Sequence, residues 1–236
     1  MKTKKTLITQ SLVLAASLAV SGGALAQAAK FQGGFAQIGL GYESVNPTHD
    51  SSTLSVNGRS LPVSTSSSNA NGATGVIGLG WYQGINDRFL LGLGIDYAPI
   101  AGASGTMTVS TPGLLPNQNN LTNDYSYQKK YSYNLYISPA VTVGENGMAY
   151  AKIGYTGAKV TNYNSLDYNF KGYSLGLGYR HMFKGGWYGF AEANFADYGN
   201  ETESATNPIA RGRTLTSSGT NGLQTYNFLV GVGYKF

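Results

Sequence analysis

The chain has 236 residues, of which only 11% are charged, against roughly 25% in ordinary soluble domains. It contains no cysteine, which excludes disulfides and thiolate metal sites. No cluster of basic residues stands out, so the sequence does not indicate a nucleic-acid-binding surface. The low charge content favours a membrane or assembly environment.

The first 26 residues have the pattern of a secretory signal peptide. Three lysines in MKTKK precede the apolar run LVLAASLAV, and ALA at 24–26 supplies the small residues of a cleavage site. The apolar run is shorter than the about 20 residues that a membrane-spanning helix needs. We expect cleavage between Ala26 and Gln27, with cleavage after Ala28 as the second choice. Residues 27–236 would then form a single domain. Loss of three lysines and no acidic residues lowers the formal net charge from +5 for the whole chain to +2 for this domain.

Eight later segments alternate large apolar residues with glycine or polar residues, as in LGLGY and VGVGY. Alternate side chains of a strand point to opposite faces, so each segment has one apolar face. The other face carries glycine rather than the lysine and glutamate of a solvated sheet, and aromatic residues gather at the strand ends. No segment approaches 18 consecutive apolar residues, which excludes a helical membrane protein. The expected strands are 33–45, 74–84, 88–100, 129–142, 147–160, 169–183, 187–199 and 223–236.

The connections between these strands alternate in length. Short turns are expected at 85–88, 144–147 and 184–186. Long connections rich in Ser, Thr, Asn and Gly are expected at 46–73, 101–128 and 200–222, with a shorter one at 161–168. This alternation is typical of an up-and-down barrel with one rim in the periplasm and the other outside the cell. Asn-Gly within LSVNGRSLPV (54–63) also predicts a β-ribbon in the first long loop.

Pairing the segments as hairpins tests which residues share a face. A hairpin register can be given as the sum of the residue numbers of two opposite residues. In the second and third strands a sum of 174 places Leu79 opposite Ile95, and in the fourth and fifth strands we expect a sum of 290. A sum of 372 for the sixth and seventh strands pairs Arg180 with Glu192. Each register sorts apolar and polar residues onto opposite faces, whereas a slip of one residue would mix them.

The signal peptide, the eight alternating strands and the ending YNFLVGVGYKF resemble the small outer-membrane β-barrels of Gram-negative bacteria, of the OmpA, OmpX and opacity types. The resemblance implies an all-β fold, an eight-stranded antiparallel transmembrane barrel in the outer membrane, whose last strand pairs with its first. It also implies that Tyr234 and Phe236 belong to a signal read by the barrel assembly machinery. Pro139 departs from the pattern because it lacks an N–H, so we expect a bulge or a strand end there.

Charged residues on the inward face predict a polar network inside the barrel. Eight strands leave an interior just wide enough for side chains to fill, and buried charges must be paired. Resemblance to the OmpA type implies that such a network closes the lumen; a gate for ions is the alternative. The predicted members are Glu43, Asp96, Lys152, Arg180 and Glu192.

His49, in the sequence HDS of the first long loop, is the candidate for chemistry. Histidine beside aspartate and serine suggests hydrolysis, but triads are defined by spatial arrangement, and adjacent residues rarely achieve it. We therefore expect a solvated loop histidine. The glycine repeats lack the spacing and the following helix of a nucleotide-binding loop, and no cofactor or metal site is expected.

The sequence thus predicts a non-catalytic outer-membrane barrel with a structural or surface-interaction role through its long extracellular loops. Its expected partners are outer-membrane lipids, the barrel assembly machinery and an unidentified extracellular ligand, and not nucleic acid. The alternatives are a narrow channel for ions or small solutes and an outer-membrane enzyme acting on lipid or peptide.

Overall fold

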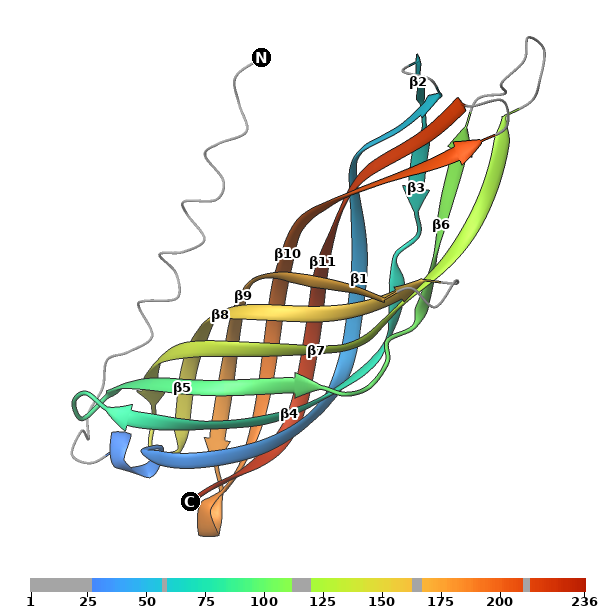
Figure 1. Cartoon of the computed structure of the whole chain (residues 1–236). Coiled ribbons are helices and arrows are strands. Elements are labelled where there is room, and N and C mark those ends of the chain that lie inside the picture. Colours follow the sequence, from blue (N-terminus) through green and yellow to red (C-terminus); the bar gives the residue numbers. More distant parts are fainter. Residues whose placement is uncertain (1–26, 57–58, 112–119, 163–166, 210–212) are drawn as a thin grey trace, which may run out of the picture.

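The computed structural model describes residues 27–56, 59–111, 120–162, 167–209 and 213–236 (Figure 1). The signal peptide and residue Ala26 lie outside the described residues. The strands in chain order are β1 (Gly33–Val56), β2 (Arg59–Pro62), β3 (Ser64–Ser67), β4 (Ala70–Gly84), β5 (Phe89–Ala98), β6 (Ser104–Thr111), β7 (Leu121–Val143), β8 (Gly147–Asn162), β9 (Asp167–Met182), β10 (Trp187–Ile209) and β11 (Arg213–Lys235). Two 3₁₀ turns, η1 (Ala28–Lys30) and η2 (Lys184–Gly186), complete the elements. Within the described part of the chain, no helix is long and apolar enough to cross a membrane.

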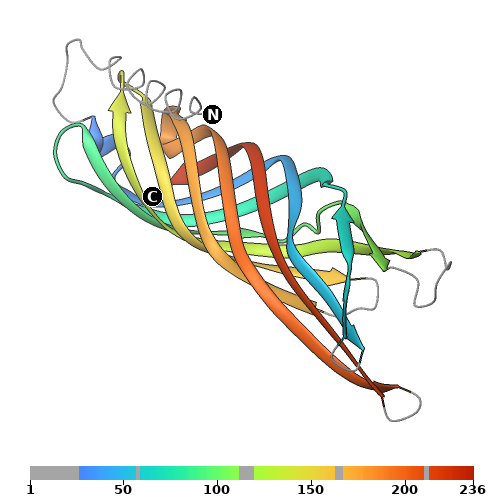
Figure 2. The same cartoon turned by 90° about the horizontal axis from the view of Figure 1, so that it is seen from above.

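Eight of the strands form a closed antiparallel barrel, which confirms the predicted fold. The order around the barrel is β7-β5-β4-β1-β11-β10-β9-β8, and pairing of β8 with β7 completes the ring. The last strand pairs with the first, from Phe35 opposite Lys235 upward. Seen from above, the strands slant around the barrel in a common direction (Figure 2). Closure gives each of these strands a neighbour on both sides, as backbone groups in lipid require.

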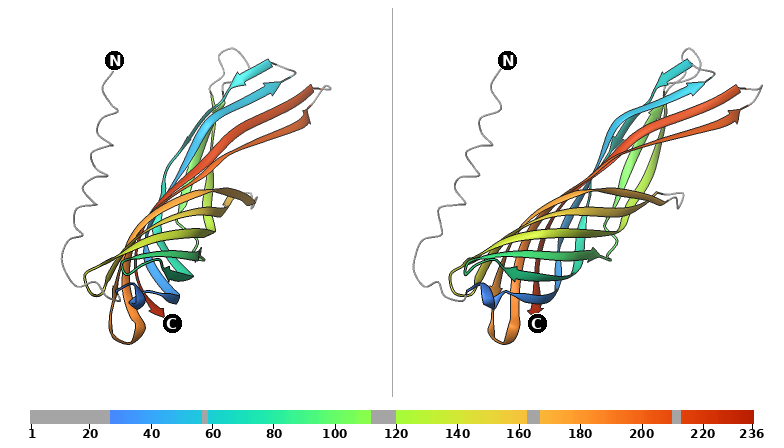
Figure 3. Two further views of the ribbon diagram at one scale, coloured as in Figure 1. Left: turned by 90° about the vertical axis from the view of Figure 1, so that its left-hand side faces the viewer. Right: turned by 60° about the vertical axis from the view of Figure 1, so that its left-hand side comes forward.

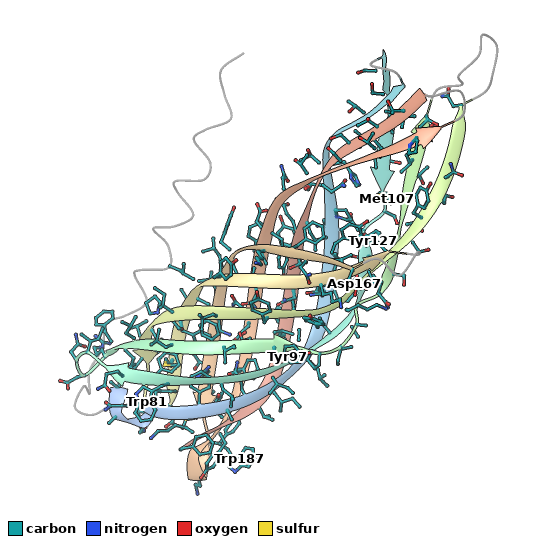
Figure 4. The ribbon with its side chains drawn as sticks, in the orientation of Figure 1. Trp81, Tyr97, Met107, Tyr127, Asp167 and Trp187 are labelled. Carbon is teal, nitrogen blue, oxygen red and sulfur yellow. The ribbon has the colours of Figure 1, made fainter. Side chains whose placement is uncertain are left out.

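The outer surface of the barrel is an apolar band between two aromatic rims. Aliphatic side chains in the band remain largely exposed in the isolated chain, as Leu177 does at 69% and Leu40 at 61%. Such exposure is expected of side chains that face lipid. The lower rim includes Trp81, Phe183, Trp187, Tyr234 and Phe236, and the upper rim includes Tyr42, Tyr97, Tyr155, Tyr173 and Tyr226. Figure 4 labels Trp81 and Trp187 near the lower end and Tyr97 higher up.

Above the upper rim, the chain continues as strands where long loops were expected. β1, β10 and β11 extend well beyond the band, β2 folds back on β1, and β3 pairs with β6, which pairs with β7 (Figure 3). The described residues of the expected loops at 46–73, 101–128 and 200–222 are therefore largely β-strands. Of these strands only the ribbon at 54–63 was predicted; its arms pair as β1 and β2, and its Asn-Gly turn lies outside the described residues. Hydroxyl pairs across β10 and β11, such as Thr202 with Thr220 at 2.9 Å and Ser204 with Ser218 at 3.0 Å, help to join the strands.

The registers predicted for two hairpins, β4–β5 with a sum of 174 and β7–β8 with a sum of 290, are confirmed by the structure. Leu79 pairs with Ile95 across β4 and β5, and the β7–β8 pairs also follow the predicted sum. The register of β9 and β10 was predicted wrongly by two residues: Arg180 pairs with Phe190, and Glu192 with Gly178. The turn centres on Gly185, whose φ of +72° suits glycine, and the N–H of Phe183 donates to the carbonyl of Trp187 at 2.7 Å.

Pro139 neither ends β7 nor introduces a bulge, contrary to the expectation. Ile137 pairs with Ile153 and Ala140 with Tyr150, so the register is unchanged across the proline. Ser138 explains this continuity, because its hydroxyl donates to the carbonyl of Ala151 at 2.7 Å. The side chain thus supplies a donor to the carbonyl opposite the proline, which has no N–H of its own.

Candidate functional site

Lys152 stands at the centre of a charge cluster inside the barrel. Its Nζ lies 2.8 Å from Asp96 Oδ2 and 2.7 Å from Glu192 Oε1, so that β8 is joined to β5 and to β10. The side chains of Lys152 and Glu192 are each 1% exposed. Tyr150 donates its hydroxyl to the same Glu192 oxygen at 2.7 Å. Ion pairs buried this completely cross-link three strands through the lumen.

Arg180 lies below this cluster and contacts no carboxylate among the described residues. Its Nη2 donates to Gln37 Oε1 at 2.9 Å, and Gln37 in turn lies 3.5 Å from Glu192. The guanidinium carbon is 4.0 to 5.1 Å from the ring centres of four aromatic residues, where cation–π attraction stabilises it. These residues are Phe35, Tyr82, Tyr150 and Tyr188. The predicted direct contact between Arg180 and Glu192 is therefore wrong. The predicted register placed the two residues opposite each other, whereas in the structure they are two positions out of step.

A second buried ion pair, between Lys129 and Glu43, lies higher in the barrel. Lys129 was absent from the predicted network because the alternation of β7 placed it outside. An irregularity between Lys129 and Tyr131 shifts the register and turns Lys129 inward. Within the described part of the chain, the second carboxylate oxygen of Glu43 has no hydrogen-bond partner.

Large rings fill most of the remaining lumen opposite the inward glycines. A Cβ on Gly94 would lie 2.4 Å from the hydroxyl of Tyr136, and one on Gly233 would lie 2.2 Å from the ring of Tyr188. A side chain at either position would therefore displace the ring that it faces. A polar cavity of about 50 Å³ remains beside Glu43 and Asp96, with room for a few water molecules.

Residues 27–32 cross the periplasmic end of the barrel. The N–H of Ala28 donates to the carbonyl of Asp87 at 3.1 Å, and Thr142 donates to the side chain of Gln27 at 3.2 Å. Lys30 Nζ donates to the carbonyl of Glu145 at 2.9 Å. Ala28 is buried, as is Phe31, which is 5% exposed. This segment therefore closes the lumen from below.

At the opposite end lies a cavity of about 310 Å³, which we call the mouth cavity. Its apolar lining is Pro47, Met107, Tyr127, Val160, Phe170 and Leu223, and its polar lining includes His49, Asp167, Asn169 and Asn221. Figure 4 labels Met107, Tyr127 and Asp167 around this region. Burial raises the pKa of Tyr127 to about 12, so its hydroxyl, which donates to the carbonyl of Ser68 at 2.7 Å, stays neutral. The size of the mouth cavity suits a small molecule.

His49 lies at the edge of the mouth cavity in a defined set of contacts, so it is not the solvated loop histidine that was expected. Its Nδ1 is 2.7 Å from Asn221 Oδ1, and its Nε2 is 2.9 Å from Ser67 Oγ. Ser67 and Asn221 were missed by sequence reasoning because they lie 18 and 172 residues from His49 along the chain. The extended strands bring the three side chains together.

All five predicted network residues lie inside the barrel, but in two groups. Asp96, Lys152 and Glu192 form one cluster with Arg180 linked through Gln37, whereas Glu43 pairs with Lys129. Tyr234 and Phe236 lie on the outside at the lower rim, with their rings 5.5 Å apart. Across the described ranges, no group of three or more His, Asp or Glu side chains is placed to hold a metal ion.

Residues 12–236 match the family model described as outer membrane protein beta-barrel domain. Among solved structures, the chain is similar to the outer membrane protein OprG from Pseudomonas aeruginosa, with 17% identity, a TM-score of 0.51 and coverage of 90% of this chain and 99% of that chain. It is also similar to Ail of Yersinia pestis, with 12% identity, a TM-score of 0.35 and coverage of 86% and 99%. The similarity to OprG supports the fold alone. No curated protein matches the chain in sequence.

Proposed function

Because this chain belongs to the outer-membrane β-barrel family and resides in the outer membrane of a Gram-negative bacterium, we propose that it is a surface-binding protein whose barrel is closed to solute flow. The observation that carries the proposal is the filled lumen. Ion pairs and rings cross the middle of the barrel, and residues 27–32 cover its lower end. The mouth cavity, of about 310 Å³, opens at the extracellular side.

Binding would take place at the mouth cavity and on the strands that rise around it. The wall of these strands is uneven, because β8 ends at Asn162 and β9 begins at Asp167, while β10 and β11 continue far above them (Figure 3). A ligand would reach the cavity from above or over the low β8–β9 hairpin. This role requires no passage through the barrel and no chemical step.

Conductance in planar lipid bilayers tests the closed lumen. The wild-type protein should give no steady porin-sized current, because eight strands enclose too little space and charged side chains occupy it. Exchanging Lys152 and Arg180 together for serine should raise the conductance. A steady, porin-sized conductance of the wild type would contradict the proposal and favour the channel.

A binding screen with a shortened β10–β11 hairpin tests the surface role. Removing residues 206–216 should leave the barrel folded, because residues 206–209 pair with residues 213–216 above the band. The shortened protein should bind extracellular ligands more weakly than the full chain does. Equal binding by the shortened and full-length proteins would show that the extended strands of β10 and β11 have no role in ligand binding.

A further inference from the structure

The contacts of His49 have the geometry of a hydrolytic triad. Nucleophile, base and orienting group form a hydrogen-bonded chain in such sites, and the orienting group can be asparagine. Here Ser67 Oγ lies 2.9 Å from His49 Nε2, and Asn221 Oδ1 lies 2.7 Å from His49 Nδ1. An amide oxygen accepts only, so it holds the proton on Nδ1 and leaves the Nε2 lone pair for the Ser67 hydroxyl.

The backbone explains why these three side chains meet. His49 and Asn221 are directly opposite each other in the pairing of β1 with β11, and β1 has an irregularity between His49 and Ser51. Bulges of this kind often re-aim side chains beside active sites. Ser67, at the end of β3, is directly opposite Met107 of β6, so both side chains lie on one face. Met107 also lines the mouth cavity, which places the hydroxyl at its edge.

We propose that Ser67, His49 and Asn221 hydrolyse esters whose apolar acyl chain occupies the mouth cavity. The proposal rests on the proposed function, since it uses the same binding site and adds a chemical step. The cavity suits this class because its lining offers Met107, Phe170 and Leu223 to an acyl chain. Asp167, the carboxylate in the lining, is already paired with Lys159 at 2.7 Å.

The reaction proceeds in two balanced steps with water as the co-reactant. Ser67 Oγ attacks the ester carbonyl carbon and gives its proton to His49 Nε2. The bond to the alcohol oxygen breaks, and the leaving alcohol takes that proton, which leaves an acyl-Ser67 ester. Water then attacks the acyl carbon and gives a proton to His49, and the proton returns to Ser67 as the carboxylic acid departs.

Covalent labelling of the folded protein tests the nucleophile. An alkyl fluorophosphonate should form a phosphorus–oxygen bond to Ser67 with loss of fluoride, and peptide mass spectrometry should locate it there. Ser67→Ala should abolish the adduct, and Ser66→Ala, on the opposite face of β3, should retain it. His49→Gln should slow labelling by about 100-fold or more, the usual scale of a general base. An unlabelled Ser67 in the wild type, or equal labelling rates with His49→Gln, would overturn the proposal.

Asn221 is a positioning residue, so its test uses replacement by an acceptor. Asn221→Asp should retain labelling, since a carboxylate oxygen also accepts from Nδ1–H, whereas Asn221→Leu should lose it with the barrel still folded by gel mobility. Equal labelling by both variants would remove Asn221 from the triad.

Turnover and binding separate this proposal from the one on which it rests. The wild type should hydrolyse p-nitrophenyl octanoate faster than the acetate, and Ser67→Ala should still bind octanoate without turnover. Equal rates on the two esters would overturn the role of the cavity. Octanoate binding without labelling or turnover by the wild type would overturn hydrolysis and leave the surface-binding function standing. Failure of the wild type to bind octanoate would overturn the role of the mouth cavity as an acyl-chain site, and the surface-binding function would still be decided by the screen with the shortened hairpin.

Discussion

Replacing Lys152 with methionine should strongly destabilise the barrel. The substitution keeps the apolar stem in place but removes the cation that lies within 2.8 Å of both Asp96 and Glu192. Removing one partner of a buried ion pair typically costs about 3–5 kcal/mol, because the remaining charge has neither water nor a counter-ion. The side chain of Glu192 is 1% exposed, so it carries most of this cost.

The surroundings of Asp96 place the expected loss at the lower end of that range. Its side chain is 14% exposed and borders the small polar cavity, so water can solvate part of its charge. We therefore expect Lys152→Met to lower the free energy of unfolding by about 3 kcal/mol. Adding Asp96→Asn and Glu192→Gln should recover part of that loss, because neither carboxylate is then left charged without its lysine, while Arg180 keeps its hydrogen bond to Gln37 and its aromatic contacts.

Urea unfolding in lipid vesicles, followed by tryptophan fluorescence, measures these differences. Trp81 and Trp187 face lipid at the lower rim and report insertion directly. Lys171→Met, at an exposed position on β9, serves as the matched control. It should change the free energy of unfolding by less than about 0.5 kcal/mol, the usual effect of a surface substitution. The reasoning would be refuted if Lys152→Met cost about the same as this control, or if the triple variant were as unstable as the single one.

Three further outcomes are expected. Deleting Phe236 should lower the amount of barrel in the outer membrane and increase periplasmic degradation, and unchanged insertion in cells would contradict its role in assembly. Amino-terminal sequencing of protein from outer membranes should begin at Gln27, whereas a retained Met1 would argue against the signal peptide. Hydrogen bonds from Lys159 and Thr161 hold the pKa of Asp167 below its usual value, so their small stabilisation is present above pH 4 or so and is lost as pH falls. Lys159→Gln should raise that pKa in an NMR titration, and an unchanged value would contradict the pairing.

Alternation predicted the barrel well because lipid and lumen impose opposite chemistry on successive residues. It located all eight barrel strands and two hairpin registers. It failed for β9 and β10 because a slip of two residues keeps every side chain on its own face, so parity cannot detect it. The position of Gly185 in the turn decides that register, and two adjacent glycines made the turn ambiguous.

Irregularities in the strands account for what sequence reasoning missed in the sites. The irregularity beside Lys129 reverses the inward parity of β7, and nothing in the local sequence signals it. The same holds for His49, whose neighbours in space depend on pairing with β11 and on the approach of β3. Long-range pairing above the membrane is set by hydroxyl-rich strands, whose two faces differ too little in polarity to fix a register from the sequence.

The hydroxyl of Ser138 makes two neighbouring positions genetically interdependent. While residue 139 is proline, Ser138 supplies the donor that the carbonyl of Ala151 would otherwise lack. Once Pro139 is exchanged for a residue with an N–H, the serine becomes dispensable for that purpose. Loss of Ser138 should therefore cost less stability after Pro139 has been exchanged than before it, so a mutational path through this strand has a preferred direction.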